Sequence, residues 1–210
     1  MNKKIIASAI TGVVIVVIAI FIMIPSQEAS NTKSDILSVS YIQTNKELQA
    51  ALDMHNIPMS SPLKLNGFSI EQYCTFFSDE DLQNSIEYCT STELLDDRGQ
   101  YLGNIHMVGS PSDPWYVIGV IQAGPTVSQL DEIKTVYQTM IESTVCTCWE
   151  DEKPGGFDSV SDWIDAANSH HLEAKRITSK SEINGLAQKN LLLEITTNTE
   201  GYLWKFIIPA

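Results

Sequence analysis

The residues best suited to chemistry are the four cysteines of this chain, which are Cys74, Cys89, Cys146 and Cys148. Cys146 and Cys148 are separated by one residue, and two thiolates at that spacing suit a soft metal ion such as Cu(I). His170 and His171, further along the chain, supply imidazole ligands of a kind that copper also accepts. These two cysteines and two histidines are the candidate metal ligands of an alternative interpretation in which copper is bound. In the preferred interpretation no cofactor is expected.

The same cysteines can also form disulfide bonds, and we prefer this structural use. Four cysteines allow three pairings. A bond between Cys146 and Cys148 would close a small, strained ring. Cys74 and Cys89 are predicted on neighbouring short helices whose turn does not bring them opposite each other. We therefore expect a crossed pattern, in which Cys74 and Cys89 each bond to one of the two later cysteines.

A long apolar stretch at residues 5–24 decides which solvent these cysteines meet. It contains no charged residue, and Lys3 and Lys4 precede it. A helix of that length spans about 30 Å, the thickness of the hydrocarbon core of a bilayer. The two lysines favour the cytoplasmic side for the N-terminus. We predict a signal anchor at residues 1–25, with a single membrane pass and the rest of the chain outside the cell.

The alternative interpretation of this stretch is a cleaved secretory signal peptide, although the apolar run is longer than such peptides use. Both interpretations place the remaining chain in the same extracytoplasmic space. Even numbers of cysteines in that space usually form disulfides. The prediction of disulfide bonds therefore holds whether or not the anchor is cut.

The charge balance of the chain excludes one class of partner. The chain has 13 Lys and Arg residues against 26 Asp and Glu residues, and its formal net charge is −13. Such a charge repels nucleic acid. The expected partners are the membrane, through residues 5–24, and a protein.

The chain after the anchor divides into a polar tether at residues 26–43 and a single domain at residues 44–210. Residues 44–90 form the predicted helical part, with capping boxes that begin at Thr44 and Ser69. Residues 91–210 contain the predicted sheet and further helices. Helices are expected to begin near Ser128 and Ser159, and strands are expected at 101–108, 115–122, 172–178, 191–197 and 202–208. The predicted fold class is α+β, with a mostly antiparallel sheet of about five strands and helices chiefly on one face.

No catalytic signature stands out in the sequence. Ser61 and Lys64 match a Ser-x-x-Lys pattern, but its partner motifs are absent and it falls in a predicted loop. We therefore assign no catalytic residue. The function expected from the sequence is a membrane-anchored extracytoplasmic binding or complex-supporting module without catalysis. The alternatives are a copper-handling domain that uses Cys146 and Cys148, and an envelope hydrolase whose site assembles only in the folded chain.

Overall fold

The computed structural model describes residues 40–210. The predicted anchor at residues 5–24 lies outside the described residues, as does most of the predicted tether at 26–43. No helix within residues 40–210 has both the length and the hydropathy needed to cross a membrane. The fold below is that of this described part.

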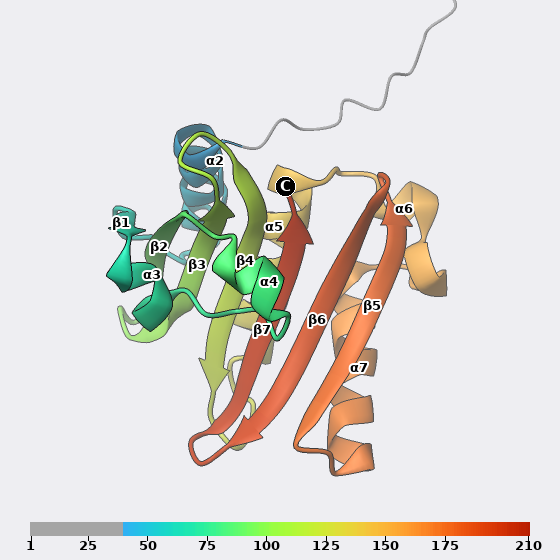
Figure 1. Ribbon diagram of the computed structural model, residues 1–210. Helices are drawn as coiled ribbons and strands as arrows, with labels where there is room; N and C mark the ends of the chain where they lie inside the picture. The colour runs from blue at the N-terminus through green and yellow to red at the C-terminus, as the bar shows by residue number, and fades with distance from the viewer. Residues whose placement is uncertain (1–39) are drawn as a thin grey trace, which may run out of the picture. The chain divides into compact units, whose positions relative to one another are not determined.

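The domain is built on one antiparallel sheet of seven strands, where the sequence predicted about five. The strands lie in the order β1-β2-β3-β4-β7-β6-β5 (Figure 1). All pairs of neighbours are antiparallel. The strands are β1 (Leu63–Asn66), β2 (Tyr88–Leu95), β3 (Tyr101–Gly109), β4 (Pro114–Ala123), β5 (Thr178–Leu186), β6 (Lys189–Asn198) and β7 (Gly201–Pro209).

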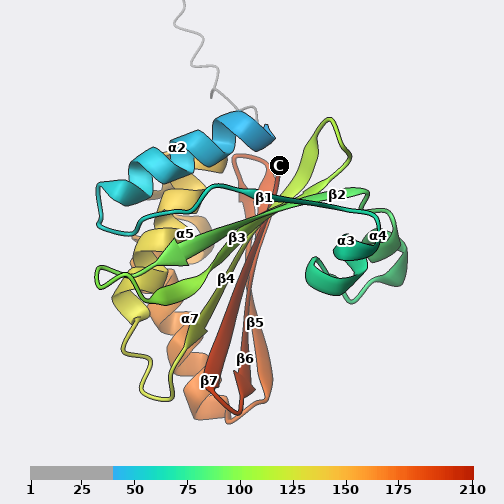
Figure 2. The same cartoon turned by 90° about the vertical axis from the view of Figure 1, so that its left-hand side faces the viewer.

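Three long helices cover one face of this sheet, and two short helices lie on the other face (Figure 2). The long helices are α2 (Tyr41–Asp53), α5 (Leu130–Thr144) and α7 (Val160–Ala174). The short ones are α3 (Phe68–Tyr73) and α4 (Glu80–Asn84). Another short helix, α6 (Trp149–Glu152), and a 3₁₀ turn, η1 (Pro154–Gly156), connect α5 to α7. The α+β class and the layering of the long helices agree with the prediction.

The main hydrophobic core lies between the sheet and the long helices. Its largest fully buried side chains include Tyr137 from α5, Trp163 from α7, and Trp204 and Phe206 from β7. The rings of Trp163 and Phe206 lie 5.8 Å apart, in an edge-to-face arrangement that aromatic pairs favour. Trp204 and Phe206, two residues apart in β7, therefore both lie in the core.

Gly119, in the middle of β4, allows helix α5 to approach the sheet closely. A Cβ atom at this position would lie 2.8 Å from Sδ of Met140 and 2.9 Å from Cε1 of Tyr137. Both α5 side chains are fully buried, so neither has free space into which it can move. Glycine at position 119 is therefore a packing requirement of the helix layer.

Several predicted element boundaries are wrong, each for a local reason. Helix α2 begins at Tyr41 because the Ser40 side chain accepts the N–H of Gln43, so Ser40, and not Thr44, is the N-cap. Residues 88–90 are a strand rather than helix, because they pair with β3. The predicted strand at 172–178 instead contains the end of α7, which continues to Ala174, and a short connection to β5, which begins only at Thr178.

Candidate functional site

The α3–α4 segment, residues 67–87, builds a second hydrophobic core on the face of the sheet opposite the long helices (Figure 2). It packs apolar side chains of its own against those of the sheet. This second core consists of Leu65, Ile70, Cys74, Ile86, Cys89, Val108, Ile118 and Ile207. The segment covers only part of the sheet face, and the strands beyond it are not covered by any helix in Figure 1.

A disulfide between Cys74 and Cys89 fastens the segment to the sheet. Cys74 directly follows α3, Cys89 belongs to β2, and their Cα atoms lie 6.6 Å apart. Both cysteines are fully buried. The second disulfide joins Cys146 to Cys148, whose Cα atoms lie 5.2 Å apart. The predicted crossed pairing is wrong, because Cys89 lies on a strand next to the end of α3 and not on a second helix.

Gln83 of α4 organises the turn between the two short helices. Its side-chain oxygen accepts the N–H groups of Phe76 and Phe77, at 2.9 Å and 3.2 Å. Its side-chain nitrogen donates to the carbonyl oxygen of Cys74 at 3.0 Å. One amide side chain therefore satisfies the hydrogen-bonding capacity of three backbone groups that lie outside helices and strands, close to the disulfide.

Three charged side chains of the sheet, Lys205, Glu194 and Lys180, form a row that contacts this turn. Lys205 of β7 donates to the carbonyl oxygen of Phe76 at 3.1 Å and forms an ion pair with Glu194 of β6 at 2.9 Å. Lys180 of β5 lies 3.3 Å from the same carboxylate. Burial alone would raise the pKa of Glu194, but hydrogen bonds and charge from the two lysines lower it below its usual value. Through the hydrogen bond from Lys205 to Phe76, this row of charged residues links the sheet to the α3–α4 segment.

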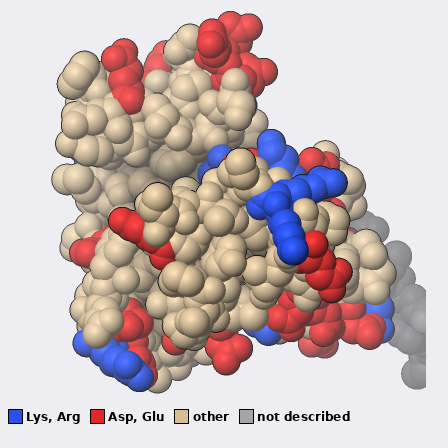
Figure 3. Space-filling view, turned by 90° about the horizontal axis from the view of Figure 1, so that it is seen from below, with Lys and Arg blue, Asp and Glu red and all other residues tan. Residues whose placement is uncertain are grey.

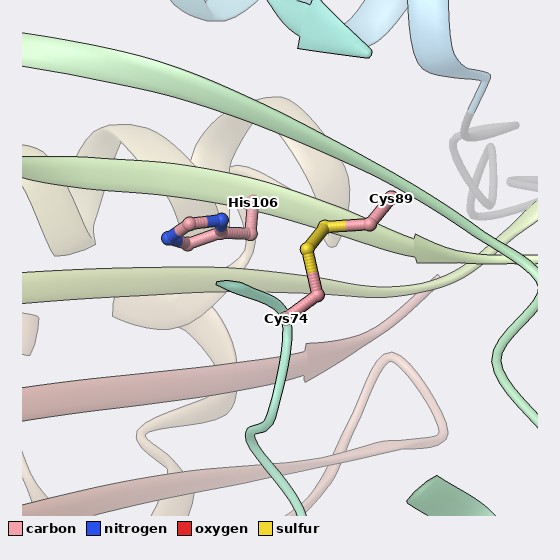
Figure 4. A group of neighbouring side chains, drawn as sticks. All are labelled: Cys74, Cys89 and His106. Atoms are coloured by element: carbon pink, nitrogen blue, oxygen red, sulfur yellow. A yellow bond between two sulfur atoms is a disulfide. The ribbon is translucent and has the colours of Figure 1, made fainter. Parts of the chain in front are cut away.

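His106 of β3 lies next to the Cys74–Cys89 disulfide (Figure 4). It is 8% exposed, and its Nδ1 atom is buried without a hydrogen-bond partner among the described residues. The ring also contacts Phe76, with the two ring centres 4.6 Å apart. Burial lowers the pKa of His106 to about 4, so the imidazole is neutral at pH 7.

An open cavity of about 510 Å³ lies beside this segment. Its lining contains two carboxylates, Glu71 and Glu87, and no Lys or Arg. Two large apolar side chains of α3, Phe68 and Tyr73, are strongly exposed, as is Leu63 of the adjoining strand β1. The complete lining is Gly67, Ile70, Glu71, Thr75, Gln83, Asn84, Ile86 and Glu87.

The structure does not bring the predicted copper ligands together. Cys146 and Cys148 lie between α5 and α6 and are bonded to each other. His171 forms hydrogen bonds to Ser179 and Thr197 instead, and His170 is exposed. Among the described residues, the group of cysteine, histidine and carboxylate side chains close enough to share a metal ion is Cys74, Cys89 and His106.

His171 also bears on the hydrolase alternative, because its Nδ1 atom lies 2.8 Å from the hydroxyl oxygen of Ser179. Ser179 lines a cavity of about 120 Å³ between α7 and the sheet. In a nucleophilic triad, a carboxylate orients the imidazole and stabilises its charged form. Here the other ring nitrogen meets the Thr197 hydroxyl at 2.9 Å, and burial and the nearby His170 lower the pKa of His171. The arrangement is that of a hydrogen-bonded core histidine.

No pattern in the sequence indicates that His106, Gln83 and Lys205 belong to one site. The alternation of residues along 101–109 indicates that His106 and Val108 share a face, which could have placed His106 near Cys89 once residues 88–90 were recognised as a strand. No local pattern marks Gln83 or Lys205, because their roles depend on contacts between segments that are distant in the chain.

Acidic residues outnumber basic ones in this chain, with 26 Asp and Glu against 13 Lys and Arg. In Figure 3, which shows the face seen from below, acidic side chains lie at many separate places on the surface, whereas basic side chains are gathered in fewer places. Compared with known proteins, this chain matches no family model, no curated protein and no solved structure.

Proposed function

We propose that this chain is a membrane-anchored, extracytoplasmic module that binds a protein partner at the cavity of the α3–α4 segment, without catalysis. Residues 5–24 form the anchor, and the residues between it and helix α2, which begins at Tyr41, separate the domain from the membrane. The pairing of all four cysteines supports an oxidising compartment, where disulfides form and persist.

The observation that carries the proposal is a cavity beside exposed apolar side chains on a segment that is rigidly held. Phe68 is 77% exposed although it begins a helix next to a hydrophobic core. Phe68 does not line the cavity but directly follows the lining residue Gly67 in the chain. Exposed apolar groups near a concave surface are typical of interaction sites. The disulfide, Gln83 and Lys205 fix the segment before a partner arrives, which lowers the ordering entropy that binding would cost.

The charge of the cavity indicates the chemistry of the partner. Glu71 and Glu87 are the charged groups of the lining, and the chain as a whole is acidic. The occupant is therefore a protein segment that inserts a Lys or Arg side chain into the cavity and covers Phe68 and Tyr73 with apolar groups. Complementary charge of this kind chiefly sets specificity and the association rate.

Photo-cross-linking of the intact anchored protein in its own membrane tests the proposal. A photoreactive amino acid replaces Phe68 in one variant and Ile177 in the control, since both side chains are 77% exposed. We expect a discrete protein adduct from position 68 and none from position 177. No adduct at position 68, or the same adducts at both positions, would refute the proposed site.

Charge reversal distinguishes specific insertion from non-specific contact. Glu71→Lys and Glu87→Lys, each combined with the photoreactive residue at position 68, should reduce the adduct about tenfold or more, because each places a cation against the partner's cation. Glu182→Lys is the matched control on exposed strand β5 and should leave the yield unchanged. An adduct that survives both cavity reversals would contradict the assignment of a basic partner.

A further inference from the structure

We propose that Cys74, Cys89 and His106 form a binding site for Cu(I) once the disulfide between the two cysteines is reduced. The inference concerns the buried side of the α3–α4 segment and does not rest on the proposed partner site. The two sites share Ile70 and Ile86, and reducing the disulfide would also release the segment that carries the partner site. The inferred Cu(I) site also differs from the copper site expected from the sequence, whose residues the structure leaves apart.

The three side chains already lie within the range that coordination needs. One ligand atom from each residue lies within 4.8 Å of the other two (Figure 4). A metal ion with metal–sulfur bonds of about 2.3 Å and a metal–nitrogen bond of about 2.0 Å holds its ligand atoms about 4 Å apart. Once the disulfide is broken, the two sulfur atoms must separate and the imidazole must approach by about 1 Å. Side-chain rotations can supply these movements.

The unpartnered nitrogen of His106 indicates which ring nitrogen carries the proton and which one is free to bind a metal ion. A buried N–H without an acceptor is tolerated less readily than an acceptor without a donor. The buried Nδ1 atom therefore carries the lone pair rather than the proton. A neutral imidazole nitrogen with a free lone pair is the form that binds metal ions. A bound cation would satisfy a polar atom that the described residues leave unsatisfied.

The surroundings of the site select Cu(I) over other ions. Thiolate ligands favour soft ions, chiefly Cu(I) and zinc. Zinc in protein sites almost always takes four ligands. Among the described residues, no fourth cysteine, histidine or carboxylate joins the group. Apolar side chains packed with it include Ile70, Ile86, Val108, Ile118 and Ile207. A group of three ligands that includes two thiolates therefore suits Cu(I) better than zinc.

Reduction must precede binding, and its chemistry can be written in full. A dithiol reductant transfers two electrons and two protons to the disulfide, so that Cys74 and Cys89 become thiols and the reductant becomes a cyclic disulfide. Cu(I) then displaces both thiol protons, because the thiolate is the metal ligand. It accepts the third bond from Nδ1 of His106. The copper ion is not oxidised or reduced.

Anaerobic titration with Cu(I) tests the site. The protein carries Cys146→Ser and Cys148→Ser, so that only one cysteine pair remains, and it is reduced before Cu(I) is added against a competing Cu(I) chelator. We expect one Cu(I) bound per chain in the reduced form and none in the oxidised form. His106→Leu should weaken binding about tenfold or more through the loss of one ligand. His55→Leu, at an exposed histidine, is the matched control and should have no effect.

A second measurement covers the case in which the reduced variant does not fold. In the reduced chain with all four cysteines, bound Cu(I) should protect Cys74 and Cys89 from alkylation, and His106→Leu should remove that protection. Protection of Cys146 and Cys148 instead, protection that does not depend on His106, or tighter binding of zinc than of Cu(I) would each overturn the proposal.

Discussion

Replacing Cys74 and Cys89 together by alanine is expected to lower the free energy of unfolding by about 3 kcal/mol. The bond closes a loop with a sequence separation of 15, and loss of a constraint on a loop of about that length costs about 3 kcal/mol through the entropy of the unfolded chain. Both sulfur atoms are buried in the second core, so the lost packing acts in the same direction. Equilibrium denaturation of the wild type and the variant measures the effect.

The matched control is the double replacement of Cys146 and Cys148 by alanine. That bond has a sequence separation of only 2, so it removes much less entropy from the unfolded chain, and its loss should cost less stability than the loss of the first bond. Limited proteolysis adds a positional readout, since only the first variant should be cut faster within residues 67–87. Equal losses of stability, or an α3–α4 segment that resists cleavage in both variants, would contradict the role of the first disulfide.

Lowering the pH from 7 to 4 is expected to cost the wild type about 3 kcal/mol of stability through His106 alone. Its pKa is about 4 in the folded state against 6.5 for an ordinary histidine. Because the unfolded chain binds the proton more readily, the contribution is complete above pH 6.5 and is lost as the pH falls from 6.5 towards 4. A tenfold difference in proton affinity between the two states corresponds to about 1.4 kcal/mol, which sets the size of the effect.

Carboxylates also titrate between pH 7 and pH 4. A comparison with His106→Gln separates the contribution of His106 to the loss of stability from theirs. The free energy of unfolding is measured at pH 7 and pH 4 for the wild type, His106→Gln and His55→Gln. The loss between the two pH values should be about 3 kcal/mol smaller for His106→Gln than for the wild type. The exposed His55 is the control and should behave as the wild type does. The same loss in all three proteins would show that His106 is not the neutral, buried group described here.

Periodicity in the sequence predicted the elements that have one clearly buried face. The helix from Ser159 and the hairpin of β6 and β7 have strong patterns, and the structure contains both. The residues of β7 illustrate the reason: Trp204, Phe206 and Ile208 share the face that lies in the main core, and Leu203 and Lys205 on the other face are half-buried. Ile207 is also on that other face, but the α3–α4 segment covers it in the second core. In such elements, local pattern and tertiary packing point to the same structure.

The candidate site was much less predictable, because contacts between distant segments decide it. Leu82, Ile86 and Cys89 have a helical spacing, yet the chain leaves the helix at Ser85 and pairs Tyr88 with Gly109. Strand pairing therefore overrides the local period and brings Cys89 to Cys74. The ring strain expected for Cys146 and Cys148 likewise did not prevent their pairing. The cavity also depends on the fold of the α3–α4 segment, so no sequence pattern marks it.

A disulfide map of the protein isolated from its own membrane tests the central claim most directly. Free thiols are blocked before isolation, the protein is digested without reduction, and linked peptides are identified by mass spectrometry. The account predicts linked peptides that join Cys74 to Cys89 and Cys146 to Cys148, with no blocked thiol at either pair. Cys74 and Cys89 recovered as blocked thiols, or joined to the later cysteines, would contradict the account of a fastened binding segment in an oxidising compartment.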